Sequence, residues 1–253
     1  RNVACRAVRD GDELVIDGTK AWVTNGERAG IVALVARTDE GISTLIVEKE
    51  PGPRFEGIST SRNVGKLGYR GIETVEMSYA GHRVPAANLV GEPGRGLSQI
   101  LSGLELGRIN IASRAVGVAR AAFDASLEYA QQRRTFGKPI AEHQAIQLKL
   151  ADMATRLEAA RLLTRSAAER KSAGLRCDVE AGMAKLFASE TALELATEAM
   201  RIHGGVGYTT ELPIERLYRD APLMVIGEGT NEIQRLVIAR GLLARARDRA
   251  GTR

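Results

Sequence analysis

The sequence has 253 residues, of which 44% are hydrophobic and 26% are charged, and 36 basic residues outnumber 31 acidic ones. A chain of this length and composition can bury the core of one large globular domain or of two smaller ones. A transmembrane protein is disfavoured, because the longest apolar runs are far shorter than the ~20 residues that a spanning helix needs.

The charged residues and the few cysteines and histidines narrow the classes of ligand. Most of the basic residues are arginine, whose guanidinium group suits phosphate oxygens, so a phosphate-rich ligand is favoured. Aromatic residues make up only 4% and no basic block is interleaved with them, so we expect neither nucleic acid nor a membrane as partner. Cys5 and Cys177 are too few for a disulfide framework, and the three histidines have no metal-ligand spacing, so no metal site is expected.

From Arg1 to about Pro85 the sequence predicts short strands joined by turns. Asp10-Gly11 and Asn25-Gly26 are turn dipeptides that tolerate a positive φ angle. β-branched or alternating runs predict strands at 13–17, 20–24, 31–37, 43–49 and 72–79. No segment long enough for a helix separates these runs, so we expect an antiparallel sheet.

After the GEPG segment at residues 91–94 the pattern changes to long amphipathic helices. Apolar residues recur at three- and four-residue steps over 109–127, 146–160 and 186–200, and a last helix is expected over 231–249. The segments FGKP, SAG and HGGVGY mark the breaks between these helices. The sequence therefore predicts an α+β fold, with an antiparallel, barrel-like β-domain over residues 1–90 and an up-down four-helix bundle over residues 91–253.

The sequence lacks the common catalytic motifs, namely a dinucleotide-binding fingerprint, a phosphate-binding P-loop and a nucleophile elbow. Polar residues gather instead at the helix breaks. In the last of these, Glu228 lies between Gly227 and Gly229, just before a helix that Thr230 or Asn231 can cap. Spacing alone also explains each of these residues as a cap or as part of a loop.

Five segments, in this order, carry a resemblance to a known family: AWVTNG, QRRTFGKPI, EHQAIQLKLADM, MRIHGGVGY and YRDAPLMVIGEGTNEIQRLVIAR. Together they resemble the acyl-CoA dehydrogenase family, and the resemblance covers essentially the whole sequence. It implies an oxidoreductase of fatty acid β-oxidation that converts an acyl-CoA thioester into the trans-2-enoyl-CoA. The family's N-terminal helical domain and the first strand of its β-domain have no counterpart here, so we expect the chain to be part of a longer protein.

The resemblance implies FAD as the cofactor. By motif, Trp22 and Thr24 would lie against the isoalloxazine ring, with Thr24 donating a hydrogen bond near N5. The other implied contacts are Arg133, Thr135 and Phe136, which reach the FAD of a neighbouring subunit, Gln144 on the adenine side, Gly204 and Gly205 through their backbone, and Thr230 and Glu232 at the start of the last helix. Arg201 stands where relatives often have glutamine, and it either contacts phosphate or turns to solvent.

Glu228 matches the family's catalytic glutamate, which removes the α-proton of the thioester. The resemblance implies that its backbone N–H, with a ribityl hydroxyl of FAD, polarises the thioester carbonyl, and a desolvated glutamate suits the proton transfer. Some relatives place the base in the first long helix, in a motif like G-L-E-L-x-R, and here that position is Gly107, which cannot serve. Arg108, Gly227 and Gly229 are expected on the substrate side, where Gly227 would leave room for a bulky acyl group.

Two alternatives stay open. One is an acyl-CoA oxidase, which has the same fold, because no single motif determines whether oxygen reaches the flavin. Nitroalkane oxidases, which are also relatives, are disfavoured because they carry aspartate in place of Glu228. The other is a non-catalytic subunit of a heteromeric dehydrogenase, although such subunits tend to lose the base or the FAD-binding residues, and this chain keeps both.

The resemblance further implies electron-transferring flavoprotein as the acceptor, a homotetramer built as a dimer of dimers, and a location in the bacterial cytoplasm or, in a eukaryote, the mitochondrial matrix. It leaves the acyl chain length and branching open.

Overall fold

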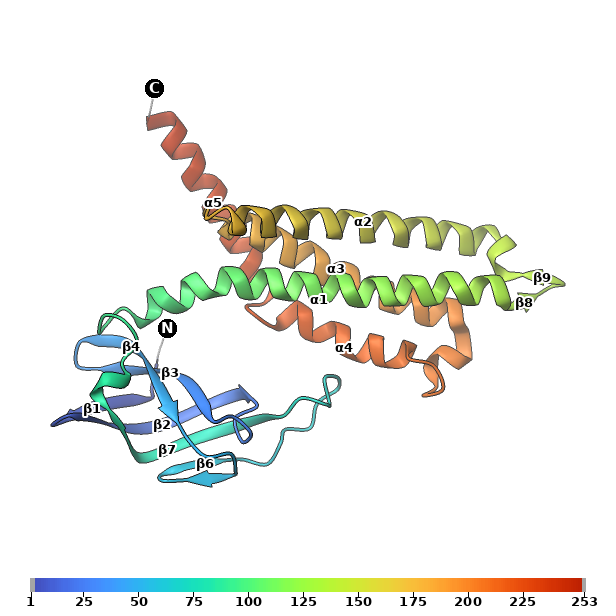
Figure 1. Cartoon of the computed structure of the whole chain (residues 1–253). Helices are drawn as coiled ribbons and strands as arrows, with labels where there is room; N and C mark the ends of the chain where they lie inside the picture. The colour runs from blue at the N-terminus through green and yellow to red at the C-terminus, as the bar shows by residue number, and fades with distance from the viewer. Residues whose placement is uncertain (1–2, 252–253) are drawn as a thin grey trace. The chain divides into compact units, whose positions relative to one another are not determined.

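The computed structural model describes residues 3–251, and the chain divides into a strand-rich unit, Arg1–Gly103, and a helical unit, Leu104–Arg253 (Figure 1). The expected α+β fold, with a large sheet followed by helices, is confirmed. Helix α1, Gly96–Gln132, contains the boundary between the two units. The domain limits that we predicted, 1–90 and 91–253, stay a prediction.

The strand-rich unit is built on a seven-stranded sheet with the order β4-β3-β1-β2-β7-β6-β5. Its strands are β1 (Arg6–Asp10), β2 (Glu13–Thr24), β3 (Ile31–Thr38), β4 (Gly41–Glu48), β5 (Arg54–Phe55), β6 (Ile58–Thr60) and β7 (Thr74–Pro85). Neighbouring strands pair antiparallel except β1 and β3, which pair in parallel at Arg6 and Arg37. The 3₁₀ helix η1 (Ala86–Asn88) follows the sheet.

Alternating burial along the strands gives this unit its core. Leu14 and Ile16 of β2 are buried while Glu13 and Val15 are only partly so, and β4 repeats the pattern. Side chains two residues apart share a face of a strand, so one face of the sheet collects the apolar residues.

Residues 13–17 and 20–24, predicted as separate strands, form the single strand β2. Gly18, which lies between the two predicted runs, has a φ angle of 131°, and the pairing with β7 shifts register between Ile16 and Asp17. A Cβ atom on Gly18 would lie 2.7 Å from the Cα atom of Cys5. The glycine therefore marks a close approach of two backbone segments and not a turn.

The helical unit continues α1 with α2 (Gln144–Ser172), α3 (Asp178–His203), α4 (Ile214–Ile226) and α5 (Asn231–Gly251). A two-stranded hairpin, β8 (Arg134–Thr135) and β9 (Lys138–Pro139), and the 3₁₀ helices η2 (Ile140–Glu142) and η3 (Gly204–Tyr208) lie between them. The predicted helical stretches lie in α1, α2, α3 and α5. Helix α4 was not predicted, because it is short and carries Pro222 in its interior.

Helix α3 packs against α2, α4 and α5 (Figure 1). Its buried face is rich in small residues: Ala181, Gly182, Ala184, Ala188, Ala192, Ala196 and Ala199. Alanines of α1, such as Ala112 and Ala119, are buried in the same core. Small side chains let helices approach one another closely, so α3 is a well-anchored support for side chains that it presents to its neighbours.

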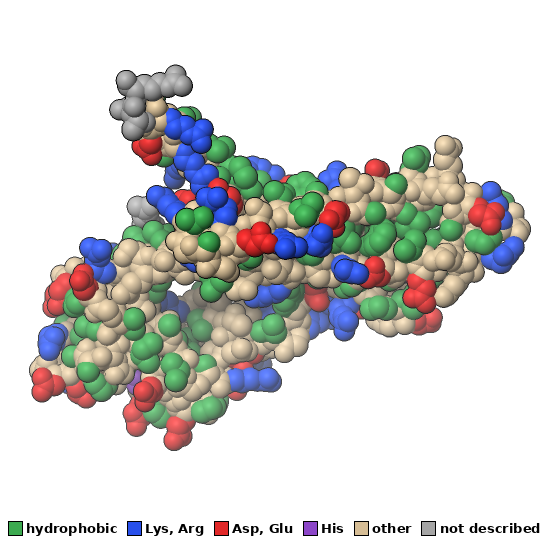
Figure 2. Space-filling view, turned by 45° about the horizontal axis from the view of Figure 1, so that its top comes forward, with side chains coloured by type: hydrophobic (Ala, Val, Ile, Leu, Met, Phe, Trp, Pro, Cys, Tyr) green, Lys and Arg blue, Asp and Glu red, His purple; other side chains and the backbone are tan. Residues whose placement is uncertain are grey.

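Basic and acidic side chains are interspersed on the face of the molecule that Figure 2 shows. Large apolar side chains are exposed among them, including Leu148 at 61% and Leu162 at 52% on α2. Such a mixed surface does not concentrate potential of one sign. Within residues 3–251, no helix combines the length and the apolar character that crossing a bilayer requires.

Candidate active site

A short loop, residues 227–230, joins α4 to α5 and carries Glu228. Glu228 and Gly229 both have positive φ angles, 53° and 85°. Thr230, one of the two expected caps, accepts a hydrogen bond on its hydroxyl oxygen from the backbone N–H of Ile233 at 3.4 Å. A glutamate at positive φ is strained, so contacts around the loop must hold it in place.

The side chain of Glu228 lies over Gly107 of helix α1. A Cβ atom at position 107 would come within 2.5 Å of Oε2 and 2.9 Å of Cδ of Glu228. A side chain at position 107 would therefore displace the Glu228 carboxylate from the place that it occupies in this structure. The desolvation that we expected for Glu228 is not found, because its side chain is exposed.

Lys185 of α3, which our sequence analysis did not identify, holds this loop from the core. Its side chain is fully buried, and Nζ donates hydrogen bonds to the carbonyl oxygens of Val225 and Gly229, both at 2.9 Å, and to Oδ1 of Asn231 at 2.8 Å. Burial lowers the pKa of Lys185 to about 8 from its ordinary value of 10.5, so the group remains an ammonium ion at neutral pH. One lysine within an apolar helical stripe gives no signal in the sequence, since most lysines are solvated.

Gln234 of α5 is the second buried residue on the loop. Its Nε2 donates to the carbonyl oxygens of Glu228 at 3.2 Å and Gly229 at 3.1 Å. A Cβ atom on Gly229 would lie 3.0 Å from the same nitrogen, so glycine fits this position both by φ angle and by space. Asn231 is tied in turn to the hydroxyl of Ser189 at 3.0 Å, which extends the network along α3.

Arg108 follows Gly107 on α1 and is only 7% exposed. Its Nε has no hydrogen-bond partner among the residues that the structure describes. A buried donor without a partner costs on the order of 1–3 kcal/mol, so this guanidinium group is a candidate for binding a ligand oxygen. Gly227, on the other side of Glu228, would bring a Cβ atom to 3.1 Å from the carbonyl oxygen of Leu223, so a larger residue fits there only tightly.

The predicted segment Arg133–Phe136 forms an exposed hairpin after α1. Phe136 and Gly137 make the turn between β8 and β9 with φ angles of 51° and 82°, and the side chain of Phe136 is 95% exposed. Thr135 is fixed by a 3.1 Å hydrogen bond between its hydroxyl and Nε2 of His143. An aromatic side chain presented in this way contributes little to the fold of its own chain, so it is available to a ligand or to another subunit.

The other predicted cofactor residues of this unit lie at helix ends. Gln144 begins α2 and is exposed, while Arg201 near the end of α3 is 65% exposed and pairs with Glu198 at 2.5 Å. Gly204 ends α3 with φ 61° and ψ −138°, a conformation that only glycine adopts readily, and a Cβ atom on it or on Gly205 would meet no neighbour. The backbone there is therefore open to close approach.

One aromatic contact relates two of these segments. The rings of Tyr129, near the end of α1, and His203, at the end of α3, are stacked with their centroids 4.3 Å apart. Arg133 and Gly204 follow these two residues closely, so the hairpin and the glycine turn lie at the same end of the helical unit (Figure 1). The loop with Glu228 leads into α5, whose second residue, Glu232, is 76% exposed.

In the strand-rich unit, Trp22 stands at a β-bulge. The pairing of β2 with β7 shifts between Lys20 and Val23, and Trp22 has a φ angle of 59° and is 74% exposed. Val23 packs on the core, whereas Trp22 and Thr24, one residue before and after it, are exposed. Bulges often redirect a side chain towards a ligand, and an exposed indole offers a flat apolar surface for a planar one.

Two buried charged residues hold the loop after this strand. Lys49 donates from Nζ to the carbonyl oxygens of Glu27 and Ala29, both at 3.1 Å, and of Glu50 at 2.8 Å. Glu73 accepts a hydrogen bond on Oε1 from the backbone N–H of Glu27 at 2.7 Å. The end of the strand that carries the tryptophan is thus anchored to the sheet, which the sequence did not predict.

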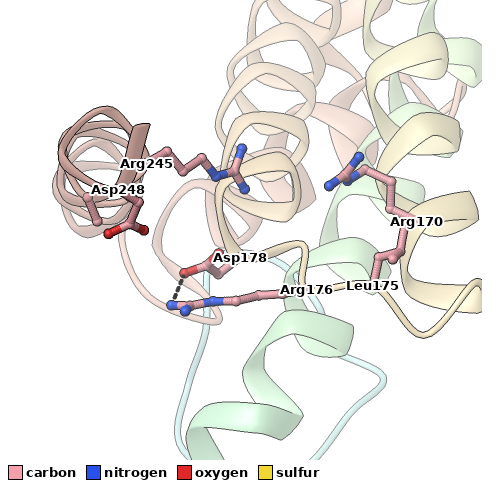
Figure 3. A pocket seen from close by; sticks show the side chains of 8 residues that line it. Arg170, Leu175, Arg176, Asp178, Arg245 and Asp248 are labelled. Carbon is pink, nitrogen blue, oxygen red and sulfur yellow. Dashed lines mark hydrogen bonds and ion pairs between the residues drawn. The ribbon is translucent and has the colours of Figure 1, made fainter. Parts of the chain in front are cut away.

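Residues of α2, α3 and α5, with Leu175 and Arg176 between α2 and α3, line a groove of the helical unit (Figure 3). Its charges are already paired: Arg176 with Asp178 at 3.0 Å, and Arg245 with Glu180 at 2.9 Å. None of the predicted site residues lines it. In the described part of the chain, no cluster of three His, Cys, Asp or Glu residues is arranged to bind a metal ion.

Comparison with known proteins supplies the identification. Family models match residues 1–81, as the middle domain of acyl-CoA dehydrogenases, and residues 94–243, as their C-terminal domain. The chain belongs to the acyl-CoA dehydrogenase family. Members of this family are flavoproteins.

Relatives within the acyl-CoA dehydrogenase family match almost the whole chain. It is 48% identical over 244 residues to the probable acyl-CoA dehydrogenase YngJ of Bacillus subtilis and 47% identical over 245 residues to the mitochondrial short-chain specific acyl-CoA dehydrogenase of Bos taurus. These matches cover 94% and 95% of this chain but only 63% and 58% of the relatives. The structure of butyryl-CoA dehydrogenase from Megasphaera elsdenii superposes with a TM-score of 0.91 at 38% identity, over 95% of this chain and 63% of that one.

Proposed function

We propose that this chain carries the catalytic base and the flavin-contacting residues of an FAD-dependent acyl-CoA dehydrogenase, with Glu228 as the base. One observation carries the proposal: the Glu228 carboxylate fills the volume next to Gly107, the position at which some relatives carry their base. A base supplied by the loop and a base supplied by the helix would thus reach the same place. The loop that presents Glu228 is strained and tied to buried residues, as a preorganised catalytic group should be.

The reaction that this arrangement supports begins with proton abstraction. The Glu228 carboxylate would take the α-proton of an acyl thioester. The backbone N–H of Glu228 would donate a hydrogen bond to the thioester carbonyl oxygen and stabilise the negative charge that develops there. Arg108, with its unpaired buried Nε, would bind an oxygen atom on the substrate side.

The residues present fit FAD, the cofactor that we propose. Bound FAD supplies the acceptor for the β-hydrogen, which leaves as hydride. Trp22 offers an exposed flat surface and Thr24 an exposed hydroxyl on the same side of the strand. At one end of the helical unit, the open backbone at Gly204 and Gly205 suits close approach to a phosphate or ribityl group.

The remaining predicted contacts to FAD divide into two groups. Arg133, Thr135, Phe136 and Gln144 would act on the cofactor of a neighbouring subunit, while Arg201, Thr230 and Glu232 would act near helix ends. Arg201 is exposed and paired with Glu198, so it would contact phosphate only by exchanging this partner. A homotetramer built as a dimer of dimers is part of the proposal, and the fully presented Phe136 supports it.

Electron-transferring flavoprotein is the acceptor that we propose. Acyl-CoA thioesters are the proposed substrates, and short acyl chains deserve the first test because relatives bear the names of short-chain and butyryl-CoA dehydrogenases. The bacterial cytoplasm, or the mitochondrial matrix in a eukaryote, stays a prediction for the location.

Anaerobic titration of the full-length flavoprotein tests this function. We expect acyl-CoA thioesters of suitable length to bleach the flavin, and the matching free acids, which lack the acidic α-proton of a thioester, to leave it oxidised. In a separate assay with oxygen present, electrons should pass to electron-transferring flavoprotein faster than to oxygen. A flavin that no acyl-CoA reduces would contradict the dehydrogenase, and rapid peroxide formation would assign the chain to the oxidases instead.

A further inference from the structure

Lys185 is an unusual residue for the interior of a helical unit. Its side chain is fully buried on α3, among helices whose core is made largely of alanine and aliphatic residues. Placing an ammonium group there is costly unless each of its protons has a partner. A lysine in such a position therefore calls for an explanation beyond packing.

The three partners of the Lys185 ammonium group enclose Glu228 in the sequence. Val225 lies before the base, in the last turn of α4, and Gly229 lies directly after it, while Asn231 begins α5. All three acceptors are neutral oxygen atoms at 2.8–2.9 Å. The ammonium ion has three protons to donate, and the site supplies three acceptors.

The backbone between these partners needs such restraint. Glu228 and Gly229 both have positive φ angles, and only Gln234 adds further hydrogen bonds to their carbonyl groups among the described residues. A shift of about 1 Å in a catalytic group can reduce a rate by ~100-fold, so the fixing of this loop bears directly on the base.

We propose that Lys185 is a positioning residue for the base: its ammonium group binds the loop on both sides of Glu228 and so sets where the carboxylate lies over Gly107. This inference rests on the proposed role of Glu228. Lys185 acts through the loop backbone and does not itself touch the side chain that takes the proton.

Lys185→Met in the full-length protein tests the inference, because methionine keeps a similar unbranched stem but has no proton to donate. We expect flavin content and KM to stay within about twofold of the parent, and kcat to fall by about 10-fold or more. Lys171→Met is the control, since it removes an ammonium group from α2 that pairs with Glu105 at 2.9 Å and, among the described residues, forms no hydrogen bond with the loop. Its kcat should equal that of the parent.

A double variant separates positioning from a general structural effect. If Lys185 acts through the base, Lys185→Met should change the residual rate of Glu228→Gln by less than about twofold, although it lowers the parent rate strongly. A loss of equal size in both backgrounds would overturn the inference, as would a folded, flavin-loaded Lys185→Met protein with the parent kcat.

Two further measurements keep the test decisive. If Lys185→Met does not fold, Lys185→Gln replaces it, because its amide still donates two hydrogen bonds, and the same non-additivity with Glu228→Gln is expected with a smaller loss. A Glu228→Gln protein that reduces its flavin at the parent rate would overturn the proposed function together with this inference. Loss of activity in Glu228→Gln but not in the lysine variants would overturn this inference alone.

Discussion

Gly107 and Glu228 belong to different elements, and a side chain at position 107 would displace the Glu228 carboxylate from its place in this structure. The carboxylate oxygen of Glu228 would lie 2.5 Å from a Cβ atom at position 107, well inside the contact distance. The backbone of Gly107 is helical and does not itself call for glycine, whereas the observed placement of Glu228 does. At the scale of single residues, the absence of a side chain at Gly107 leaves the space that the Glu228 carboxylate occupies.

Gly107→Ala should separate activity from stability. Alanine in a helix interior is favoured over glycine by roughly 0.5–1 kcal/mol, so the midpoint of thermal unfolding should stay the same or rise. The added methyl group displaces the Glu228 carboxylate, so kcat/KM should fall by about 10-fold or more.

Gly117→Ala is the control for this change. It lies in the same helix, and its Cβ atom would meet nothing within 4 Å, so the variant should gain the stability without losing activity. Equal activity in the two variants would show that Glu228 does not need the space over Gly107.

The sequence predicted the positions of the candidate site better than the contacts that hold them. The period of apolar residues is a local property, and it located four of the helices and the main strands correctly. The supports of the site are not local: Lys185 binds Gly229 from 44 residues away, and Lys49 binds Glu27 from 22 away. No periodic pattern records such contacts, because a buried lysine and a solvated one look alike in the sequence.

Backbone conformation was a second feature of the site that the sequence did not predict. The bulge at Trp22 and its positive φ angle depend on the register between β2 and β7, which the sequence of β2 alone does not contain. The turn at Phe136 and Gly137 was only a helix break in the sequence, and the structure shows a hairpin whose tip presents the aromatic ring. Both cases concern residues that a tertiary context forces into unusual conformations.

At the scale of elements, α3 links the site to the rest of the helical unit. It supplies Lys185 and Ser189 to the base loop, and at its other end it leads into Gly204. It also binds α5 through a double hydrogen bond from Arg245 to Glu180, at 2.9 and 3.0 Å. The base loop is therefore held between helices that are joined to each other independently.

The Glu180 pair should make stability depend on acid pH. Hydrogen bonds from Arg245 hold the pKa of Glu180 below its ordinary value of 4.5, so the pair stabilises the fold fully above that value and is lost as pH falls through the lowered pKa. Glu180→Gln should reduce the free energy of unfolding by about 1 kcal/mol at pH 7, since partial exposure weakens the pair. Denaturant titrations at a series of pH values should show this difference shrinking towards zero as the pH falls below 4.5 and through the lowered pKa of Glu180.

Glu169→Gln is the comparison for the pH series. Glu169 pairs with Arg165 on the surface of α2, where both side chains are more than 60% exposed, so its removal should cost less than about 0.5 kcal/mol at any pH. A difference for Glu180→Gln that does not change with pH would show that the loss arises from packing and not from the charge of the pair.

At the scale of the whole molecule, two aromatic side chains are exposed although packing within the chain gives no reason for them. Phe136 is 95% exposed and Trp22 is 74% exposed. An exposed aromatic ring offers a flat apolar surface to a ligand or to another subunit. The proposed FAD and the proposed tetramer would provide these partners.

Phe136→Ala should therefore affect cofactor retention and not folding. Because the ring contacts little of its own chain, the free energy of unfolding of the flavin-free protein should change by less than about 0.5 kcal/mol. The flavin retained after gel filtration should fall several-fold, measured as the ratio of flavin absorbance to protein. Leu175→Ala, a change at another exposed apolar residue, should retain flavin fully, and equal retention in both variants would argue against a role for Phe136 at the cofactor.

The most direct test of the account is the rate at which acyl-CoA reduces the flavin in Glu228→Gln, measured by rapid mixing without oxygen. Glutamine keeps the size of the side chain but cannot accept the α-proton, so the rate should fall by at least about 10²–10⁴-fold, with flavin content and acyl-CoA affinity retained. Glu194→Gln, at an exposed glutamate of α3 that pairs with Arg156 at 3.0 Å, should reduce at the parent rate. Flavin reduction at the parent rate in Glu228→Gln would contradict the central claim that Glu228 is the base.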